Sequence, residues 1–314
     1  MKKTRLCDLL SIEYPIIQGA MRFISMSEMV AAVSMAGGLG TLAGSSALKD
    51  MLAQEIFKVR QITDKPFTVN ISLRRKNAPE IVDLVIEQKI PVVITSAGDP
   101  SRFIKVLKDN GIRVLHVVPS VRLAKKAEEA GVDAVIAEGT ESGGHVGFDE
   151  ITTMVLIPQV VEQVKIPVIA AGGFADGRGL VAALSLGAEG IQMGTRFLAT
   201  TEAIVHDNYK KAIIEAQDND TTVIGRSGAP LRVLKTPFVQ QLLEMEKKGS
   251  SMAEIEAFME TQSAPATSPD VVKGMMSAGQ VAGLIREVKS IGRVIRDIMA
   301  EADAVLEKLS ALKG

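Results

Sequence analysis

The strongest constraint on this chain is a repeated pattern in which a short apolar run is followed by a segment with helical periodicity. Each run is continuously apolar, which is typical of strands buried on both faces of a parallel sheet. Proline stands at or just before the start of four runs, where its missing amide hydrogen costs little. The runs predict eight strands, at residues 15–21, 39–44, 67–72, 91–98, 113–120, 134–139, 167–173 and 190–197.

Eight such β/α units predict an α/β fold of the closed (β/α)8 or TIM-barrel type. A doubly wound open sheet is the alternative, but it normally uses fewer strands. We expect residues 1–219 and 270–290 to form the barrel and residues 220–269 to be an inserted, lid-like region. That region is predicted to hold turns and one charged helix, at about 238–260.

Two further helices are expected at the end of the chain, at about 270–288 and within 291–314. Apolar residues recur at helical spacing in the last of them, and core packing or a subunit contact would explain their pattern. Near the other end of the chain, the sequence SMSE at 25–28 predicts a capping box at the start of a helix.

Composition excludes several classes of function. The chain has 36 Lys and Arg against 37 Asp and Glu, a formal net charge of -1, which argues against broad binding to nucleic acid or anionic membranes. The single cysteine excludes a Cys-rich metal site, and three histidines leave little for a His-based zinc site. No apolar run approaches the roughly 18 residues of a membrane span, and the N-terminal stretch is too interrupted for a signal peptide. We therefore expect a cytoplasmic enzyme.

The active site of such a barrel lies at the carboxyl ends of its strands. After the seventh and eighth strands, the sequences AAGG and QMGT place glycine amides at the usual phosphate site of this fold. The candidate residues there are Gly172, Gly173, Gly194 and the hydroxyl of Thr195. The alternative is that these glycines only allow tight turns at the strand ends. Even if they do bind a phosphate, the glycine loops alone do not identify which phosphate-bearing ligand it belongs to.

Three side chains are candidates for chemistry. His145 lies in a glycine-rich loop of about a dozen residues after the sixth strand, which we expect to be mobile and to lie at the catalytic face, and its near-neutral pKa suits proton transfer. The alternative is that it is a solvent-facing residue of a mobile loop. Asn70 and Glu138 end the third and sixth strands, where each could face a ligand or only satisfy nearby groups. His116, within a strand, and His206, after the eighth, are interpreted as structural.

Several motifs together resemble one known family. In order, they are YPIIQGAM, AGGLGTL, DKPFTVNI, DAVIAEGTESGGHVG, IPVIAAGGFADGRG, AEGIQMGTRF and GMMSAGQVAGLI. They are similar to the FMN-dependent barrel family that contains the FabK-type enoyl-acyl-carrier-protein reductases (enoyl-ACP reductase II) and the nitronate monooxygenases, once called 2-nitropropane dioxygenases. The resemblance runs from about residue 4 to residue 290.

The resemblance implies a non-covalent FMN. Its phosphate would lie on Gly173, Gly194 and Thr195, and His145 matches the active-site histidine beside the flavin. The resemblance places the isoalloxazine ring near Gly19, Ala20, Met21, Asn70 and Glu138. Gly144, Gly172 and Met193 complete the implied cofactor site.

Within the family, GTESGGHVG with the following TTMVLIPQV, and HDNYKKAI, look closer to the reductases. The implied reaction passes hydride from NADH or NADPH to FMN and then to a trans-2-enoyl thioester of fatty acid synthesis. The thioester would be carried by an acyl carrier protein, and His145 would supply a proton. The alternative is a nitronate monooxygenase, in which His145 binds or deprotonates a nitroalkane and O2 reoxidises the flavin. A flavin-free phosphate-binding barrel, or a non-catalytic binding protein, is a third hypothesis. A homodimer is also expected from the family.

Two stretches at the predicted barrel mouth depart from the reductase pattern, residues 21–23 and 73–77. They contribute Arg22, Arg74, Arg75 and Lys76. These cations could receive an anion such as an acidic carrier protein, a coenzyme A phosphate or the phosphate of NADPH. An ordinary solvated loop is the alternative.

Overall fold

Eight parallel strands form a barrel in the computed structural model, which describes residues 3–44, 48–260 and 264–313. A parallel bridge between Ile17 and Leu39 joins the two ends of the sheet and closes it. The predicted fold class is thus confirmed. Around the barrel the strand order is β1-β9-β8-β6-β5-β4-β3-β2. The strands are β1 (Ile16–Gln18), β2 (Gly40–Ala43), β3 (Phe67–Ser72), β4 (Val92–Ser96), β5 (Arg113–Val118), β6 (Ala134–Glu138), β8 (Val168–Ala171) and β9 (Gly190–Met193).

Two apolar layers explain why the strands read as continuous apolar runs. Val92 and Ile94 of β4 point into the barrel, where they join one buried cluster. Val93, between them, belongs to a second cluster that lies between the strands and the helices. Since successive side chains of a strand point to opposite faces, both faces must be apolar.

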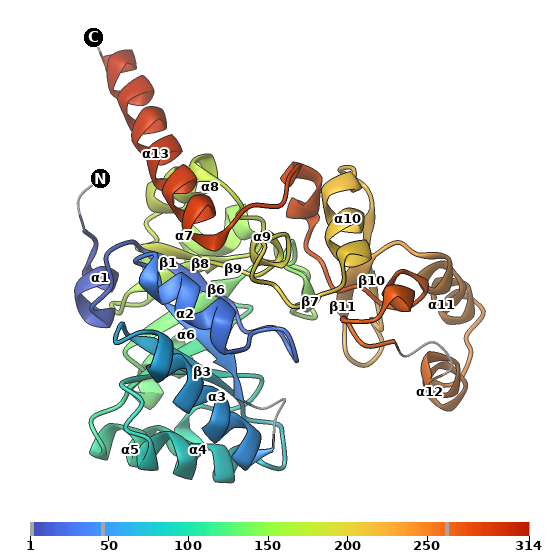
Figure 1. The fold of residues 1–314 in the computed structure, drawn as a ribbon, viewed down its shortest axis with the longest axis horizontal. Coiled ribbons are helices and arrows are strands. Elements are labelled where there is room, and N and C mark those ends of the chain that lie inside the picture. Colours follow the sequence, from blue (N-terminus) through green and yellow to red (C-terminus); the bar gives the residue numbers. More distant parts are fainter. Residues whose placement is uncertain (1–2, 45–47, 261–263, 314) are drawn as a thin grey trace.

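Helices cover the outside of the barrel (Figure 1). They are α2 (Ser27–Met35), α3 (Lys49–Ile62), α4 (Ala78–Glu87), α5 (Ser101–Asp109), α6 (Val121–Ala130), α7 (Thr153–Gln163), α8 (Gly177–Ser185), α9 (Thr195–Leu198) and α10 (Asp207–Glu215). The helix before the barrel, α1 (Arg5–Leu10), buries Leu6, Cys7 and Leu10 in the same cluster as the barrel interior. Cys7 is therefore a packing residue.

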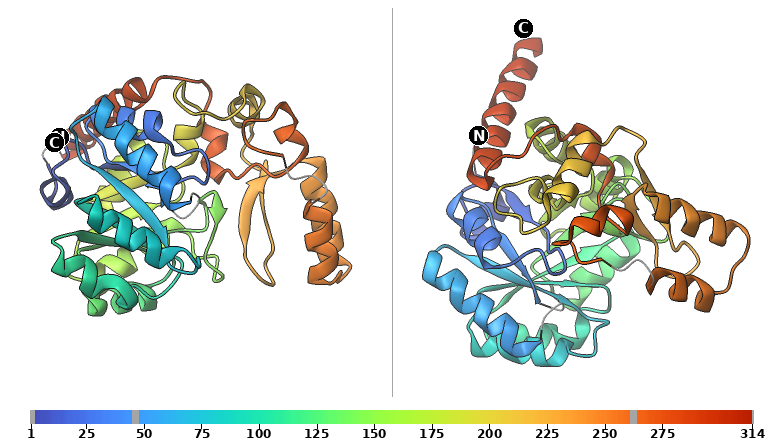
Figure 2. Two further views of the ribbon diagram at one scale, coloured as in Figure 1. Left: turned by 60° about the horizontal axis from the view of Figure 1, so that its bottom comes forward. Right: turned by 45° about the vertical axis from the view of Figure 1, so that its right-hand side comes forward.

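The inserted region forms a lobe with its own apolar cluster. It contains an antiparallel hairpin, β10 (Thr221–Ile224) and β11 (Leu231–Leu234), followed by α11 (Pro237–Lys247) and α12 (Met252–Glu260). Figure 2 shows these elements at one flank of the barrel. Side chains of the hairpin and of both helices pack together, and the rings of Phe238 and Phe258 stack with centroids 4.8 Å apart.

Two predictions for this part of the chain were wrong. The stretch predicted as turns contains the hairpin, and the helix predicted at about 238–260 is two helices. The chain turns between α11 and α12, where Gly249 has a φ of 75°, a conformation that suits glycine. The prediction failed because both helices share one apolar face pattern, which does not reveal a short turn between them.

The segment predicted as a helix at about 270–288 is also different. It contains only two short 3-10 helices, η2 (Pro269–Lys273) and η3 (Gln280–Leu284). The last helix, α13 (Ile291–Ser310), occupies its predicted position and is followed by the short η4 (Ala311–Lys313). It packs on α8 and α2 through buried apolar residues, and its last turns project beyond the barrel (Figure 1). Within the described residues, no helix combines the length and apolarity that a membrane crossing requires.

Candidate active site

The carboxyl ends of the strands bring most of the predicted site residues to one rim of the barrel. The register pairs Glu138 with Ala171, Ala171 with Gln192, and Gln18 with Met193. Across the barrel, Asn70 pairs with Ala43 at the end of β2. The residues that follow the strands, Gly19–Met21, Gly172–Gly173 and Gly194–Thr195, are therefore neighbours around this rim.

The loop after β1 is fixed by side chains that were not predicted as site residues. The buried side chain of Gln18 donates to the hydroxyl of Ser25 at 2.8 Å and accepts from the amide of Thr41 at 2.9 Å. The same Ser25 hydroxyl accepts from the amide of Met21 at 2.8 Å. The predicted capping box was therefore wrong, because Ser25 holds the site loop and α2 begins after Met26 without a side-chain cap.

The glycine loops after β8 and β9 form a cradle of free amides. The backbone amides of Gly173 and Gly194 have no hydrogen-bond partner in the described part of the chain. Gly172 and Gly173 have φ angles of 94° and 86°, which favour glycine. The hydroxyl of Thr195 accepts from the amide of Gly279 at 3.0 Å and keeps its own hydrogen to donate.

Gly194 provides the sharpest sign of a ligand. Its φ of -113° is one that any residue can adopt. A β-carbon built at this position would meet nothing closer than the Met21 sulfur at 3.9 Å. Neither the backbone nor the packing of this chain requires glycine here, whereas a group held on the neighbouring amides would need the space. This arrangement fits the phosphate of an FMN.

His145 lies in a short strand and not in the predicted mobile loop. The strand β7 (Gly144–His145) pairs antiparallel with β11, with His145 opposite Leu231 and Gly144 opposite Arg232. Beyond it, the amide of Val146 donates to the carbonyl of Pro230 at 3.0 Å. The loop prediction was wrong because the partner strand is about 90 residues away in sequence, where local patterns carry no information.

Three arginines shape the electrostatics of His145, whose side chain is exposed at the mouth. Desolvation lowers the pKa of the imidazole, and the charges of Arg75, Arg74 and Arg22, in that order, lower it further. Like charges near the ring disfavour its protonated form. The neutral imidazole is therefore favoured at neutral pH.

Replacing Arg75 by glutamine is expected to raise the pKa of His145 toward its ordinary value, because one positive neighbour is removed. An NMR titration of the imidazole ring would measure this pKa. Arg113→Gln, at the opposite end of β5, is the matched control and should leave the pKa of His145 where it was. An unchanged pKa in both variants would show that the Arg75 charge does not act on His145.

Glu138 is a partly accessible carboxyl group at the end of β6. Burial raises its pKa to about 7. No cation forms an ion pair with Glu138 within the described ranges. Near neutral pH the group can therefore hold or release a proton.

The raised pKa of Glu138 predicts a pH-dependent effect on stability. Between about pH 4.5 and pH 7, the unfolded protein ionises this group while the folded protein still holds the proton, so the folded state loses stability as the pH rises. Glu138→Gln should remove that loss, a gain of up to about 3 kcal/mol above pH 7 and almost none below pH 4.5. Urea unfolding of flavin-free protein at both pH values would measure the difference. If Glu138→Gln changed the free energy of unfolding by the same amount at both pH values, the raised pKa would be contradicted.

The other two histidines lie in contacts that hold the fold. His116 is buried inside β5, where its Nδ1 lies 2.7 Å from the Thr95 hydroxyl, and burial lowers its pKa to about 4. His206 caps α10, and its ring nitrogen accepts from the amide of Asn208 at 3.1 Å.

Sequence analysis missed the residues that hold the segment leading to His145. Arg232, 7% exposed, donates from Nε to the Thr140 carbonyl at 2.8 Å and from Nη1 to the Thr221 hydroxyl at 3.2 Å. On the other side, the Glu141 carboxylate accepts from the amide of Thr153 and its carbonyl accepts from the amide of Gln280. Gln280 lies in the GMMSAGQVAGLI motif, which is one of the family-like motifs of the sequence. No residue pattern indicated Arg232.

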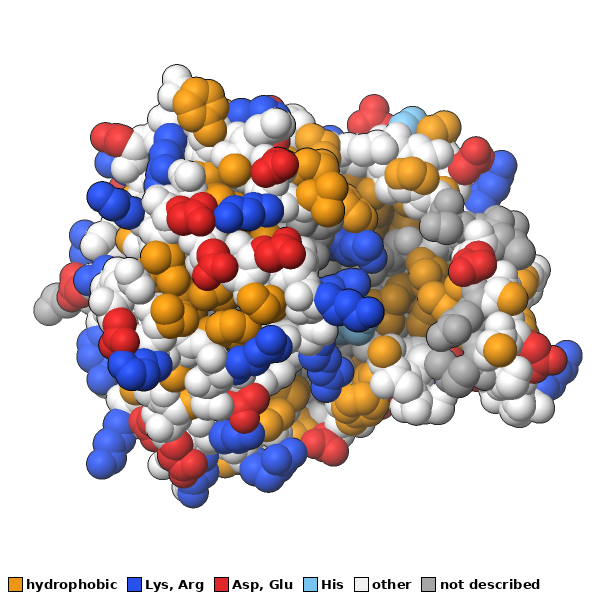
Figure 3. Space-filling model, turned by 90° about the horizontal axis from the view of Figure 1, so that it is seen from below, with side chains coloured by type: hydrophobic (Ala, Val, Ile, Leu, Met, Phe, Trp, Pro, Cys, Tyr) orange, Lys and Arg blue, Asp and Glu red, His pale blue; other side chains and the backbone are white. Residues whose placement is uncertain are grey.

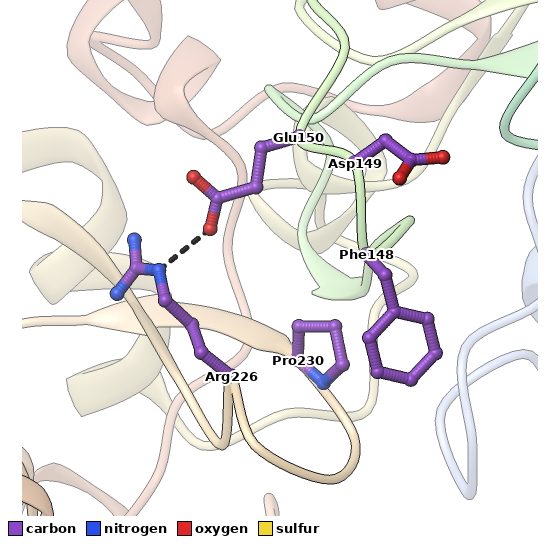
Figure 4. Close-up of a pocket in the computed structure, with 5 residues that line it drawn as sticks. All are labelled: Phe148, Asp149, Glu150, Arg226 and Pro230. Carbon is purple, nitrogen blue, oxygen red and sulfur yellow. Dashed lines mark hydrogen bonds and ion pairs between the residues drawn. The ribbon is translucent and has the colours of Figure 1, made fainter.

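A pocket of about 250 Å³ lies where the hairpin turn meets the loop after His145 (Figure 4). Phe148, Asp149 and Glu150 line one side, and Arg226 and Pro230 line the other. The Nε of Arg226 lies 2.6 Å from a carboxylate oxygen of Glu150. This ion pair is a further link between the inserted lobe and the segment that carries His145.

The predicted cations at the barrel mouth are all exposed. Arg22 follows β1, and Arg74, Arg75 and Lys76 follow β3. Across the described ranges, no group of three or more His, Cys, Asp or Glu side chains is placed to hold a metal ion. The chemistry of this rim therefore comes from one imidazole, one carboxyl group, free amides and cations.

Comparison with known proteins decides the family. The family model described as nitronate monooxygenase matches residues 3–83 and 79–301. The chain belongs to the nitronate monooxygenase family. It is also 46% identical to FabK from Thermotoga maritima, with a TM-score of 0.95 over 99% of this chain and 100% of that one.

Two curated relatives of the family add detail. A hydroxy-methyl-oxo-octahydroindene-carboxyl-CoA dehydrogenase of Rhodococcus jostii is 34% identical over 99% of each chain. A probable nitronate monooxygenase of Staphylococcus saprophyticus is 37% identical over 77% of this chain and 81% of that protein. Together with FabK, these members identify the chain as a flavin oxidoreductase of this family.

Proposed function

We propose that this protein is an FMN-dependent oxidoreductase that uses NADH or NADPH to reduce trans-2-enoyl thioesters. The observation that carries the proposal is the likeness to FabK, which extends over nearly the whole of both chains at 46% identity. The relative from Rhodococcus jostii, named for a carboxyl-CoA compound, supports a thioester substrate. An acyl carrier protein is a second possible carrier of the acyl group.

The residues of the rim would each contribute to the cofactor site. The amides of Gly173 and Gly194 and the hydroxyl of Thr195 would bind the phosphate. The remaining cofactor contacts would come from Gly19, Ala20, Met21, Asn70, Glu138, Gly144, Gly172 and Met193. When bound, the flavin supplies the hydride chemistry, and the protein supplies orientation, electrostatics and a proton.

His145 would act on the thioester as a proton donor. Hydride arriving at the β-carbon leaves negative charge on the α-carbon and the thioester oxygen. The neutral imidazole, which is the form favoured at neutral pH, can donate its N–H to the developing enolate oxygen, and the small protonated fraction of the ring can deliver its proton to the α-carbon. The pairing of β7 with β11 and the contacts of Arg232 fix the segment on which His145 stands.

A nitronate monooxygenase is the second candidate, favoured by the description of the matching family model and by the staphylococcal relative. In that reaction His145 would bind or deprotonate a nitroalkane, and O2 would reoxidise the flavin. Stopped-flow mixing of the reduced protein separates the two functions. We expect anaerobic reoxidation by crotonyl-CoA. Reoxidation only by O2 in the presence of a nitronate would replace the first proposal with the second.

A further inference from the structure

Arg22, Arg74 and Arg75 are a group of cations without partners. In the part of the chain that the structure describes, no ion pair engages any of them. Arg22 follows β1, and Arg74 and Arg75 follow β3, so all three stand at the rim formed by the carboxyl ends of the strands. Their charges also reach the imidazole of His145, whose pKa they lower.

The surface around this place has two different walls. Figure 3 shows a hollow between the barrel and the inserted lobe. Lys and Arg side chains border it on the barrel side, where a histidine is visible among them, and hydrophobic side chains border it on the side of the lobe. The hollow therefore offers a cationic wall and an apolar wall to one ligand.

One of the three arginines is held in place by its neighbour. The Arg22 guanidinium lies 4.6 Å from the centroid of the Phe23 ring, a distance at which a cation is attracted by the ring. Phe23 is exposed and has a φ of 59°, which is costly for a bulky residue. Backbone strain of this kind is found preferentially at functional sites.

The chemistry of this group matches a phosphate. Like charges that gather without counter-charges repel one another, and an anion with several oxygen atoms removes that repulsion. The planar fork of arginine binds phosphate through two parallel hydrogen bonds. A thioester of phosphopantetheine carries such a phosphate on the same molecule as the reacting double bond and the apolar acyl chain. A nitronate is small and has a single charge.

We propose that Arg22, Arg74 and Arg75 form the site that recognises the phosphate of a pantetheine-bearing thioester, whether the carrier is coenzyme A or an acyl carrier protein. The proposal rests on the enoyl thioester reductase function above and assigns the part of the site that selects the carrier. The apolar wall of the lobe receives the acyl chain.

The test compares the double variant Arg74→Gln, Arg75→Gln and the single variant Arg22→Gln with the wild-type holoenzyme. The substrates are crotonyl-CoA, crotonyl-3′-dephospho-CoA, crotonyl-acyl carrier protein and crotonyl-pantetheine, which has no phosphate. We expect the KM of the double variant for the phosphate-bearing substrates to rise at least about tenfold, the effect of losing hydrogen bonds to a charged group. The KM for crotonyl-pantetheine should not change.

Arg113→Gln is the matched control, because Arg113 is an exposed, unpaired arginine at the start of β5, on the opposite rim. It should behave as wild type with every substrate. Calorimetric titration with coenzyme A, 3′-dephospho-coenzyme A and pantetheine gives a second readout that does not depend on turnover. The double variant should lose at least about tenfold in affinity for coenzyme A and none for pantetheine.

The outcomes separate the two proposals. Equal kinetics for crotonyl-CoA and crotonyl-pantetheine in wild type and variants would overturn the phosphate site and leave the reductase function standing. A rise confined to the KM for NADPH, with NADH and all thioesters unaffected, would also overturn it and assign the arginines to the nicotinamide cofactor. Failure of every thioester to reoxidise reduced wild-type protein would instead refute the reductase function itself.

The same measurements identify the carrier. A larger rise in KM of the double variant for crotonyl-CoA than for crotonyl-acyl carrier protein would identify coenzyme A as the natural carrier, and the reverse would identify the acyl carrier protein.

Discussion

His145→Ala is expected to reduce turnover about 100-fold to 10,000-fold, the contribution that a positioned proton donor normally makes. The side chain stands beside the rim on which the flavin would lie, and its pKa is held low by desolvation and by the three arginines. Alanine removes the donor without adding volume or charge. The flavin absorbance of the purified variant should match that of wild type, because none of the phosphate contacts is lost. Stopped-flow measurement of flavin reoxidation by crotonyl-CoA isolates the affected step.

His206→Asn is the control for this prediction. His206 has only a capping role at α10, and asparagine is among the best N-cap residues. The control should therefore retain full turnover and full stability. If His145→Ala turned over at the wild-type rate with its flavin bound, the proton would have to come from another group, and Glu138 would be the first to test, because its raised pKa lets it hold a proton near neutral pH.

Gly194→Val is expected to weaken FMN binding roughly tenfold to hundredfold, since forcing extra volume into a filled site costs about 1–3 kcal/mol. In the flavin-free protein a β-carbon at this position makes only an ordinary van der Waals contact, with the Met21 sulfur at 3.9 Å, and the φ of -113° is open to any residue. The apoprotein should therefore fold and melt as wild type does. Fluorescence titration of the apoprotein with FMN would measure the affinity.

Gly292→Ala provides the control for Gly194→Val. Gly292 lies in α13, where a β-carbon would approach only the flexible end of the Arg296 side chain, and its substitution should leave FMN affinity unchanged. Wild-type FMN affinity in Gly194→Val would mean that the cofactor phosphate does not lie on this glycine. The cradle after β8 and β9 would then be a structural turn, as the alternative interpretation of the glycines holds.

The barrel could be predicted from the sequence because a short apolar run of neighbouring residues marks each strand. β3, for example, lies at the predicted residues 67–72, where Phe67, Val69 and Ile71 join the apolar cluster between the strands and the helices. The eighth predicted strand ran too far, to residue 197, because α9 begins at Thr195 with apolar residues of its own. The glycine loops and His145 could also be picked out from the sequence, because few other residue types can adopt such backbone angles or transfer a proton near neutral pH.

The support of the site could not be predicted because it depends on contacts between distant segments. Arg232 lies about 90 residues from Thr140, the residue whose carbonyl it binds. Ser25 looked like a helix cap because the SMSE pattern is typical of one, yet its hydroxyl holds Gln18 and Met21 instead. A local sequence pattern indicates which hydrogen bonds a side chain is able to form. The partner that it actually binds depends on the tertiary structure.

The antiparallel pairing of β7 with β11 has an evolutionary consequence. The imidazole is attached to the barrel through its own chain, but its alignment is set by a strand that belongs to the insertion. A change in the insertion that tilts the hairpin would therefore move His145 relative to the barrel without altering any residue of the barrel rim. A chimera that exchanges the insertion must exchange residues 140–146 with it to keep the histidine aligned.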